Sequence, residues 1–243
     1  MIDVGRFRFS LWPTLMTVPA VIVMVVLGFW QLERLAWKTE LVERIAERTT
    51  QAPVGLDGLS WDEGRDEYLR VRLRGSFVHD QELYLAARSR NNNVGFHVFT
   101  PFVLTNGMAV LVNRGWVPSE RRDPARRAEG QIAGETDLTA LVRLTQKQGM
   151  MQPDNDAAKN VWFFVDLPEM KKASGIATEI DYWFDADATP NPGGFPIGGQ
   201  TRVSLPNDHL QYAVTWFVFA LTLSAIFLIY SWRRRRADGD PAS

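Results

Sequence analysis

Two uncharged, mostly apolar runs stand near the two ends of this chain, at residues 11–32 and 210–232. A bilayer core of about 30 Å requires roughly 20 apolar residues in a helix that rises ~1.5 Å per residue. Either run is long enough to cross it. Backbone groups inside lipid must find partners within their own segment, which makes both runs helices. The pattern therefore predicts a transmembrane hairpin of two helices, 11–32 and 210–232.

Helical spacing continues beyond the first run. Leu35 and Val42 extend the apolar stripe, while Glu40 and Arg44 form an i,i+4 pair. Gln51, Ala52 and Pro53 then end the helix. Residues 33–52 are predicted to form an amphipathic helical stalk.

The segment between the spans, 53–209, changes to a period of two. Apolar residues alternate with arginines from Tyr68 to Arg74, which predicts a half-buried strand with 82–88 as its hairpin partner. A second hairpin is predicted from 95–104 and 108–116, because Asn106-Gly107 between them is a strong turn signal.

Further elements complete the middle segment. Strands are predicted at 138–144, 161–165 and 182–186, and a short helix at 167–174 with Asp166 as its N-cap. The arginine-rich stretch 119–132 is compatible with a basic contact patch, but its charge pattern favours a solvated helix or loop. Short strands follow one another without crossover helices, which indicates one antiparallel-dominated α+β domain.

Charges beside the second span orient the hairpin. Arg233–Arg236 follow this span, and only Arg202 lies close before it. The positive-inside rule then places 1–10 and 233–243 in the cytoplasm and the domain 53–209 in the periplasm. The first span has no cleavage site and no transit peptide before it, so the expected location is a bacterial inner membrane.

Composition excludes several kinds of chemistry. The chain has no cysteine, three histidines and a net charge of -1. Thiol redox chemistry and thiolate metal sites are thereby excluded, and nothing favours nucleic acid as a partner. No phosphate loop, nucleophile elbow or metal-spaced histidine pair is present, so we do not expect an enzyme.

The outer end of the second span carries the main candidate site. His209 follows Asn207-Asp208, either of which would cap the helix, and Tyr212 and Trp216 share its face at i+3 and i+7. The first span brings residues of its own to the same depth, namely Gly28, Trp30 and Gln31. Gly28 would let a second backbone or a flat ligand approach closely.

Two interpretations of this cluster remain open. An imidazole at the membrane surface, beside aromatic rings, suits the axial position of a lipophilic haem. Tyrosine and tryptophan are also enriched at membrane interfaces without any ligand, and a histidine at that depth is stable without one. The residues themselves favour the second interpretation.

Four motifs, in order, resemble the Surfeit-locus-one family of cytochrome c oxidase assembly proteins. They are Leu-Gly-Phe-Trp-Gln-Leu-Glu-Arg at 27–34, Gly-Phe-His-Val-Phe-Thr-Pro-Phe at 95–102, Val-Asn-Arg-Gly-Trp-Val-Pro at 112–118, and Asn-Asp-His-Leu-Gln-Tyr-Ala at 207–213 with Trp216. The motifs run through almost the full length of the chain, and the two spans stand where the family has them.

The resemblance implies a non-enzymatic assembly factor that binds haem A and assists its insertion into the oxidase catalytic subunit, at the haem a3 site. His209 matches the family's proposed haem ligand. The implied partners are the catalytic subunit and membrane lipid, with the haem A synthase as a further candidate. The alternative is a membrane scaffold that stabilises the nascent catalytic subunit without binding haem. The remaining motif residues have no settled role: Gln31, Arg34, Asn207, Arg114, Gly115 and Trp116.

Overall fold

The computed structural model describes residues 2–4, 7–201 and 206–238, with side chains over 10–201 and 206–234. Arg6 and Arg202, as well as residues 239–243 of the expected tail, lie outside the described residues. The chain forms two compact units, 1–44 with 204–243, and 45–203.

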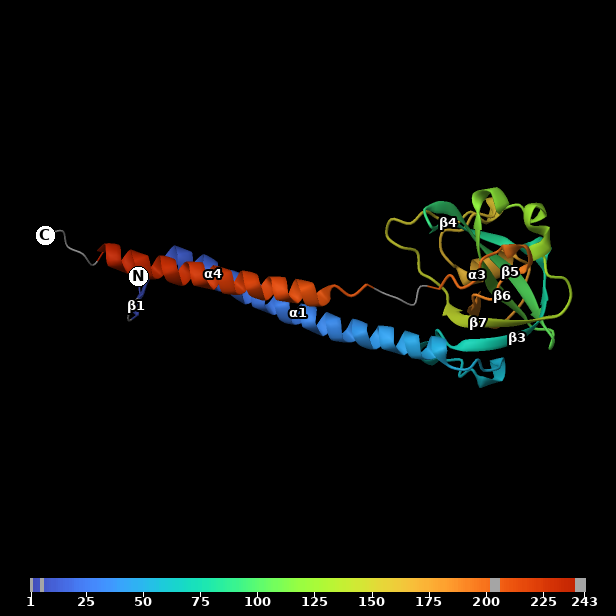
Figure 1. Ribbon diagram of the computed structural model, residues 1–243, viewed down its shortest axis with the longest axis horizontal. Coiled ribbons are helices and arrows are strands. Elements are labelled where there is room, and N and C mark those ends of the chain that lie inside the picture. Colours follow the sequence, from blue (N-terminus) through green and yellow to red (C-terminus); the bar gives the residue numbers. More distant parts are fainter. Residues whose placement is uncertain (1, 5–6, 202–205, 239–243) are drawn as a thin grey trace. The chain divides into compact units, whose positions relative to one another are not determined.

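Two long helices build the first unit, α1 (Leu11–Thr50) and α4 (His209–Asp238), which lie side by side in Figure 1. A short antiparallel pair, β1 (Ile2–Val4) and β2 (Phe7–Phe9), precedes α1. The expected span 11–32 and stalk 33–52 form one continuous helix that ends at Thr50. The second span begins at His209, one residue before its apolar run.

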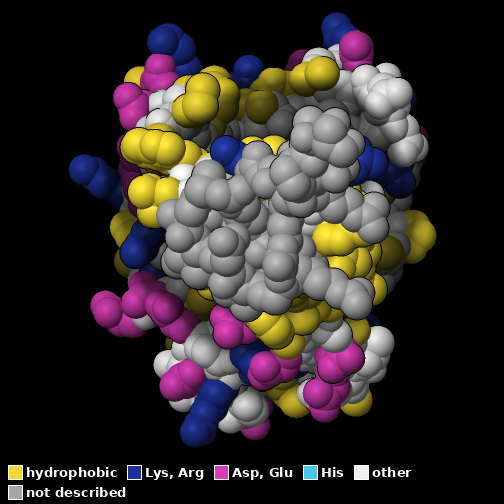
Figure 2. Space-filling model, turned by 90° about the vertical axis from the view of Figure 1, so that its left-hand side faces the viewer, with side chains coloured by type: hydrophobic (Ala, Val, Ile, Leu, Met, Phe, Trp, Pro, Cys, Tyr) yellow, Lys and Arg dark blue, Asp and Glu magenta, His cyan; other side chains and the backbone are white. Residues whose placement is uncertain are grey.

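Both helices have an apolar window with a mean hydropathy of 2.1, and almost all of each window is exposed in this chain. Large exposed side chains include Leu15, Ile22 and Phe29 on α1 and Val218 and Leu221 on α4. Figure 2 also shows exposed hydrophobic side chains among charged ones on the face that it presents. Apolar surface of this extent matches hydrocarbon better than water, so the two helices fit a two-span membrane protein.

A six-stranded sheet in the order β3-β7-β8-β6-β5-β4 forms the second unit. β6 and β8 are parallel, while the other neighbours are antiparallel. β3 also pairs with β5, which closes five strands into a ring and leaves β4 outside it. The strands are β3 (Arg70–Phe77), β4 (Leu83–Arg90), β5 (Asn93–Leu104), β6 (Ala109–Pro118), β7 (Thr136–Leu144) and β8 (Tyr182–Ala186).

Short helices occupy the connections of this mixed α+β domain. They are α2 (Glu63–Asp66), α3 (Leu167–Ala173) and the 3-10 turns η1 (Leu56–Gly58), η2 (His79–Gln81), η3 (Ser119–Arg121), η4 (Pro124–Gly130), η5 (Ala157–Lys159) and η6 (Pro192–Gly194).

The hairpin of β5 and β6 confirms the prediction made from Asn106-Gly107. β7, β8 and α3 are also confirmed, and Asp166 caps α3 by accepting a hydrogen bond from the Glu169 amide. Local signals were sufficient here because the turn and the cap are made by neighbours in sequence.

One predicted pairing and one predicted strand were wrong. A strand does form at the predicted 82–88, as β4, but it pairs with β5 and not with β3. Residues 161–165 form only isolated bridges, such as Leu85 with Trp162. Side-chain amides bind this segment's backbone: Asn155 accepts from the Phe163 amide and Gln146 from the Val165 amide. These bonds replace a strand ladder.

Alternate residues of the strands enter two large apolar cores, and a smaller third cluster contains Tyr84, Val98 and Val117. Val112 of β6 packs in the first core and Leu111 in the second. The first core includes Val71, Leu73, Phe102 and Phe184. The second includes Leu85, Phe99, Trp162 and Met170, the last of these from α3. Residues that follow Val112 on β6 carry polar groups into both faces, as described next.

Candidate functional site

His209 is the first residue of α4, and its ring faces α1. Its Nδ1 atom lies 2.6 Å from the Oε1 atom of Gln31. An amide oxygen only accepts hydrogen bonds, so Nδ1 donates and carries the ring proton. Nε2 then keeps its lone pair, and it has no hydrogen-bond partner among the described residues. Gln31 therefore fixes the tautomer that a metal-binding imidazole requires.

Gly28 is a close contact between the two helices. A Cβ atom at this position would come within 2.6 Å of the Phe217 ring. Phe29 packs edge-on against the same ring, with 5.4 Å between the ring centroids. The close approach expected at Gly28 thus exists, but the Phe217 side chain of α4 makes it rather than a ligand.

The aromatic residues predicted beside His209 do not enclose it. Trp30 and Tyr212 are 49% and 57% exposed, whereas Trp216 is half-buried. Arg34 places its guanidinium over the Trp37 ring at 4.4 Å. Exposed rings at a helix end suit a membrane interface, or one side of a flat lipophilic ligand.

Asn207 does not act as the expected helix cap. Its Nδ2 group donates to the Thr39 hydroxyl at 3.2 Å, and its Oδ1 atom is buried without a hydrogen-bond partner in the described part of the chain. The Asp208 carbonyl accepts the Tyr212 amide in the first turn of α4. Asn207 therefore ties the start of α4 to α1 instead of capping it.

The motif at 113–116 forms a β-bulge in β6. Its register with β5 shifts between Val98 and Phe99. Gly115 adopts a φ of +122°, and a Cβ atom there would collide with the Ile197 carbonyl. Both features require glycine. The Asn113 side chain accepts the Gly115 amide at 3.1 Å and braces the bulge.

Arg114 points from this bulge into a buried ionic cluster, which the sequence did not predict. Glu82 lies between the guanidinium groups of Arg114 and Arg127, and each of the three side chains is at most 2% exposed. Arg114 also donates to the Gly130 carbonyl and to Asn191. The stretch 119–132 was predicted as a solvated helix or loop. It forms the short turns η3 and η4 and is exposed over most of its length, but Arg127 lies inside the domain.

The buried ionic cluster lowers the pKa of Glu82. Burial raises the pKa of Glu82, but the neighbouring His79 ring, 3.7 Å away, and the hydrogen bonds and charge of Arg127 outweigh burial and lower the pKa to about 2. Burial lowers the pKa of Arg114 to about 10, although Glu82 opposes this change. Glu82 thus stays ionised and compensates two buried cations.

On the opposite face of β6, Asn113 joins a second polar network. Its Nδ2 group lies 2.8 Å from the Asp185 Oδ1 atom and 3.3 Å from the His97 Nδ1 atom. Thr201 donates to the other carboxylate oxygen of Asp185. Burial and Arg88 lower the pKa of His97 to about 3, so its ring is neutral. Burial raises the pKa of Asp185 to about 6, against Thr201, Arg143 and Asn113.

Trp116, the last residue of the motif 113–116, contacts two other segments of the domain. Its backbone pairs with Ile197, and its indole Nε1 donates to the Arg88 carbonyl at 3.0 Å. Residues 113–116 therefore connect β6 to several segments of the domain that are distant in sequence. The sequence alone could not show these contacts, because only the bond between Asn113 and Gly115 joins near neighbours.

Comparison with known proteins places these features in a family. A family model described as the SURF1 family matches residues 18–221. Surfeit locus protein 1 of Gallus gallus is 39% identical over 220 residues, which cover 84% of this chain and 70% of the relative. The Homo sapiens protein of the same name is 36% identical over 231 residues, with coverage of 88% and 74%. A SURF1-like protein of Monosiga brevicollis is 37% identical over 228 residues, with coverage of 88% and 85%. The match includes α1 from its second turn, the whole domain and the first half of α4, and this chain belongs to the SURF1 family.

Proposed function

We propose that this protein is an assembly factor for a haem–copper cytochrome c oxidase, and that it binds haem A through His209 and assists insertion into the catalytic subunit. Membership of the SURF1 family supports the assembly role. The observation that carries the haem part is the hydrogen bond between His209 Nδ1 and Gln31 Oε1.

The residues at the start of α4 fit a haem ligand set. His209 donates from Nδ1 to Gln31, which orients the ring and leaves Nε2 as the nitrogen for a ligand bond. The exposed Trp30 and Tyr212 rings offer apolar surface to a macrocycle. Gly28 takes no part, because Phe217 fills the space above it. When bound, haem A would supply an iron atom that accepts an imidazole nitrogen as axial ligand.

A lipophilic cofactor and a membrane-embedded partner also suit this location. α1 and α4 have the length and hydropathy of two membrane spans. The arginines that follow α4 favour a cytoplasmic C-terminus. The proposal therefore includes a bacterial inner membrane, cytoplasmic termini and a periplasmic domain, with His209 at the periplasmic surface and the oxidase catalytic subunit and haem A synthase as partners.

Visible spectroscopy tests the haem part. The full-length protein is purified in detergent from cells that make haem A, as wild type, His209→Ala and His79→Gln. We expect haem A with wild type and with His79→Gln, a control that removes a histidine from the domain, and loss of haem A with His209→Ala. If the purified wild-type protein carries no haem A, the carrier function is refuted.

Crosslinking tests the assembly part separately. A crosslinker placed on the domain should capture the oxidase catalytic subunit in cells. If capture persists when haem A synthesis is blocked and in His209→Ala, the protein is a scaffold rather than a haem carrier. If no capture occurs in any strain, the proposed partner is wrong.

A further inference from the structure

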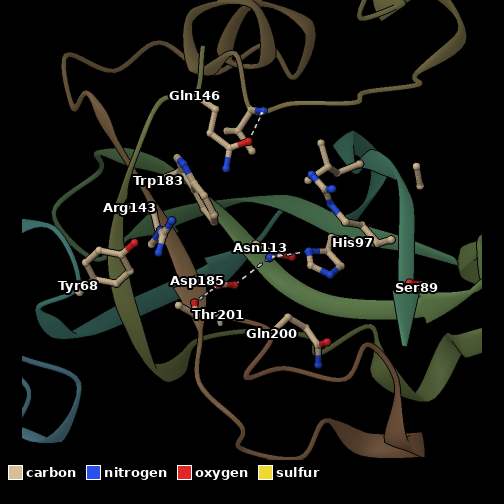
Figure 3. Close-up of a pocket in the computed structure, with 14 residues that line it drawn as sticks. Tyr68, Ser89, His97, Asn113, Arg143, Gln146, Trp183, Asp185, Gln200 and Thr201 are labelled. Carbon is tan, nitrogen blue, oxygen red and sulfur yellow. Dashed lines mark hydrogen bonds between the residues drawn. The ribbon is translucent and has the colours of Figure 1, made fainter. Parts of the chain in front are cut away.

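A cavity of about 410 Å³ opens in the domain between β4, β7 and β8 (Figure 3). All its lining residues belong to the unit 45–203, so the cavity does not include His209. Its volume lies within the range of small-molecule sites, about 300–1,000 Å³. Two of the family motifs reach it, one through His97 and the other through Asn113.

The polar side chains on the floor of this cavity hydrogen-bond to one another. Asn113 donates to Asp185, and Thr201 donates to the second oxygen of the same carboxylate. Both oxygens of Asp185 are therefore in use. The described residues contain no group of three histidine or carboxylate side chains that could hold a metal ion. The carboxylate on the floor therefore has no oxygen left without a hydrogen bond that would favour a cation.

The wall of the cavity differs, because its arginine lacks acceptors. The Arg143 side chain is 18% exposed, and its guanidinium lies 4.3 Å from the Tyr68 ring centroid and 5.7 Å from that of Trp183. Its nearest carboxylate oxygen, on Glu67, is 3.7 Å away and beyond hydrogen-bond distance. Within the part of the chain that the structure describes, none of its N–H groups makes a hydrogen bond, and Nε is buried.

Gln146 adds a second vacant donor. Its Oε1 atom accepts the Val165 amide at 3.3 Å, which leaves the NH₂ group without a partner among the described residues. Figure 3 shows Arg143, Gln146, Tyr68 and Trp183 around the same space. A partly buried guanidinium that makes no hydrogen bond is unfavourable, since it gives up part of its hydration without gaining an acceptor.

We propose that this cavity binds the carboxylate group of a small organic acid, with Arg143 as its anchor and the Gln146 amide as a second donor. A guanidinium presents parallel N–H groups in a planar fork that matches a carboxylate. Arg88, which also lines the cavity, adds positive charge. The Tyr68 and Trp183 rings, which line the cavity beside Arg143, offer apolar surface to the carbon skeleton. The inference rests on the domain alone and stands independently of haem binding.

Calorimetric titration of the full-length protein in detergent tests this proposal, with sodium acetate, succinate and benzoate as probes at constant ionic strength. We expect saturable binding of at least one carboxylate to wild type, and at least a tenfold loss of affinity in Arg143→Gln. Arg74→Gln is the matched control. It removes the same charge from a neighbouring strand, where the Arg74 side chain is 65% exposed and outside the cavity.

A second variant keeps the test decisive if Arg143→Gln fails to fold. Ser89 is an exposed residue that lines the cavity, so Ser89→Phe should obstruct it without changing the guanidinium. Loss of binding in Ser89→Phe supports the proposal. Binding that survives in either variant overturns it, as does the absence of saturable binding up to ~10 mM ligand, which is weaker than about −3 kcal/mol. Equal affinity for sulfate or phosphate would refute carboxylate recognition.

Discussion

Replacement of Glu82 by glutamine should destabilise the domain severely. Glu82 is the carboxylate between Arg114 and Arg127, and all three side chains are buried. Glutamine keeps the shape of the side chain but removes its charge. It also places an NH₂ donor where Arg127 donates two hydrogen bonds at present. Two buried guanidinium groups would then lack their compensating charge.

Two estimates of the magnitude agree. Breaking a buried ion pair by removal of one partner costs about 3–5 kcal/mol. The lowered pKa of Glu82, about 2 against 4.5 in the unfolded chain, corresponds to a stabilisation on the order of 3 kcal/mol. Because the folded pKa is depressed, this stabilisation is complete above pH 4.5 and is lost as the pH falls toward 2.

Urea unfolding of the full-length protein in detergent, followed by near-UV circular dichroism, measures both effects. Glu135→Gln is the matched control, because it breaks the exposed pair with Arg74 and should cost at most ~1 kcal/mol. Glu82→Gln should lower the unfolding midpoint far more than Glu135→Gln. It should also flatten the loss of stability below pH 4.5. Equal midpoints for the two variants would refute the reasoning.

Two other substitutions test the bulge and the second network. Gly115→Ala should destabilise the domain more than Gly107→Ala. Both glycines have a positive φ, but only at Gly115 would a Cβ atom collide with backbone. Urea unfolding midpoints measure the difference, and equal losses would mean that the contact with Ile197 is unimportant. For Asp185, whose pKa is raised to about 6, wild-type stability should fall as the pH rises from about 4 through 6, by on the order of 2–3 kcal/mol. Asp185→Asn should remove this slope between about pH 4 and 6. The exposed Asp137→Asn should keep it, and an unchanged slope in Asp185→Asn would show that Asp185 is not its source.

The sequence predicted best the features that neighbouring residues determine. The two spans follow from length and apolarity, and the β5–β6 hairpin follows from its Asn-Gly turn. Pairing of distant strands was not accessible. β4 follows β3 closely in sequence but pairs with β5, and β3 closes the ring through β7 and β5. Such pairings depend on how side chains from distant strands pack in the apolar cores, which no local pattern encodes.

The candidate site shows the same division. The lengths of the two spans put Gly28, Gln31 and His209 at the same depth, but they could not show that Phe217 would cover Gly28 or that Gln31 would hold the imidazole. Conversely, Arg127 stood in a stretch with the charge pattern of a solvated loop. Its burial depends on a single acidic residue, Glu82, which lies 45 positions away.

The two groups of motif residues therefore differ in kind. Asn113, Arg114, Gly115 and Trp116 all have partners within the domain, and each partner explains why that residue type is needed. Substitutions there should reduce function through loss of folded protein. His209 is different, because the structure accounts for one ring nitrogen and leaves the other without a partner among the described residues. A variant of His209 that lost function while it kept the stability of the wild type would separate ligand binding from folding.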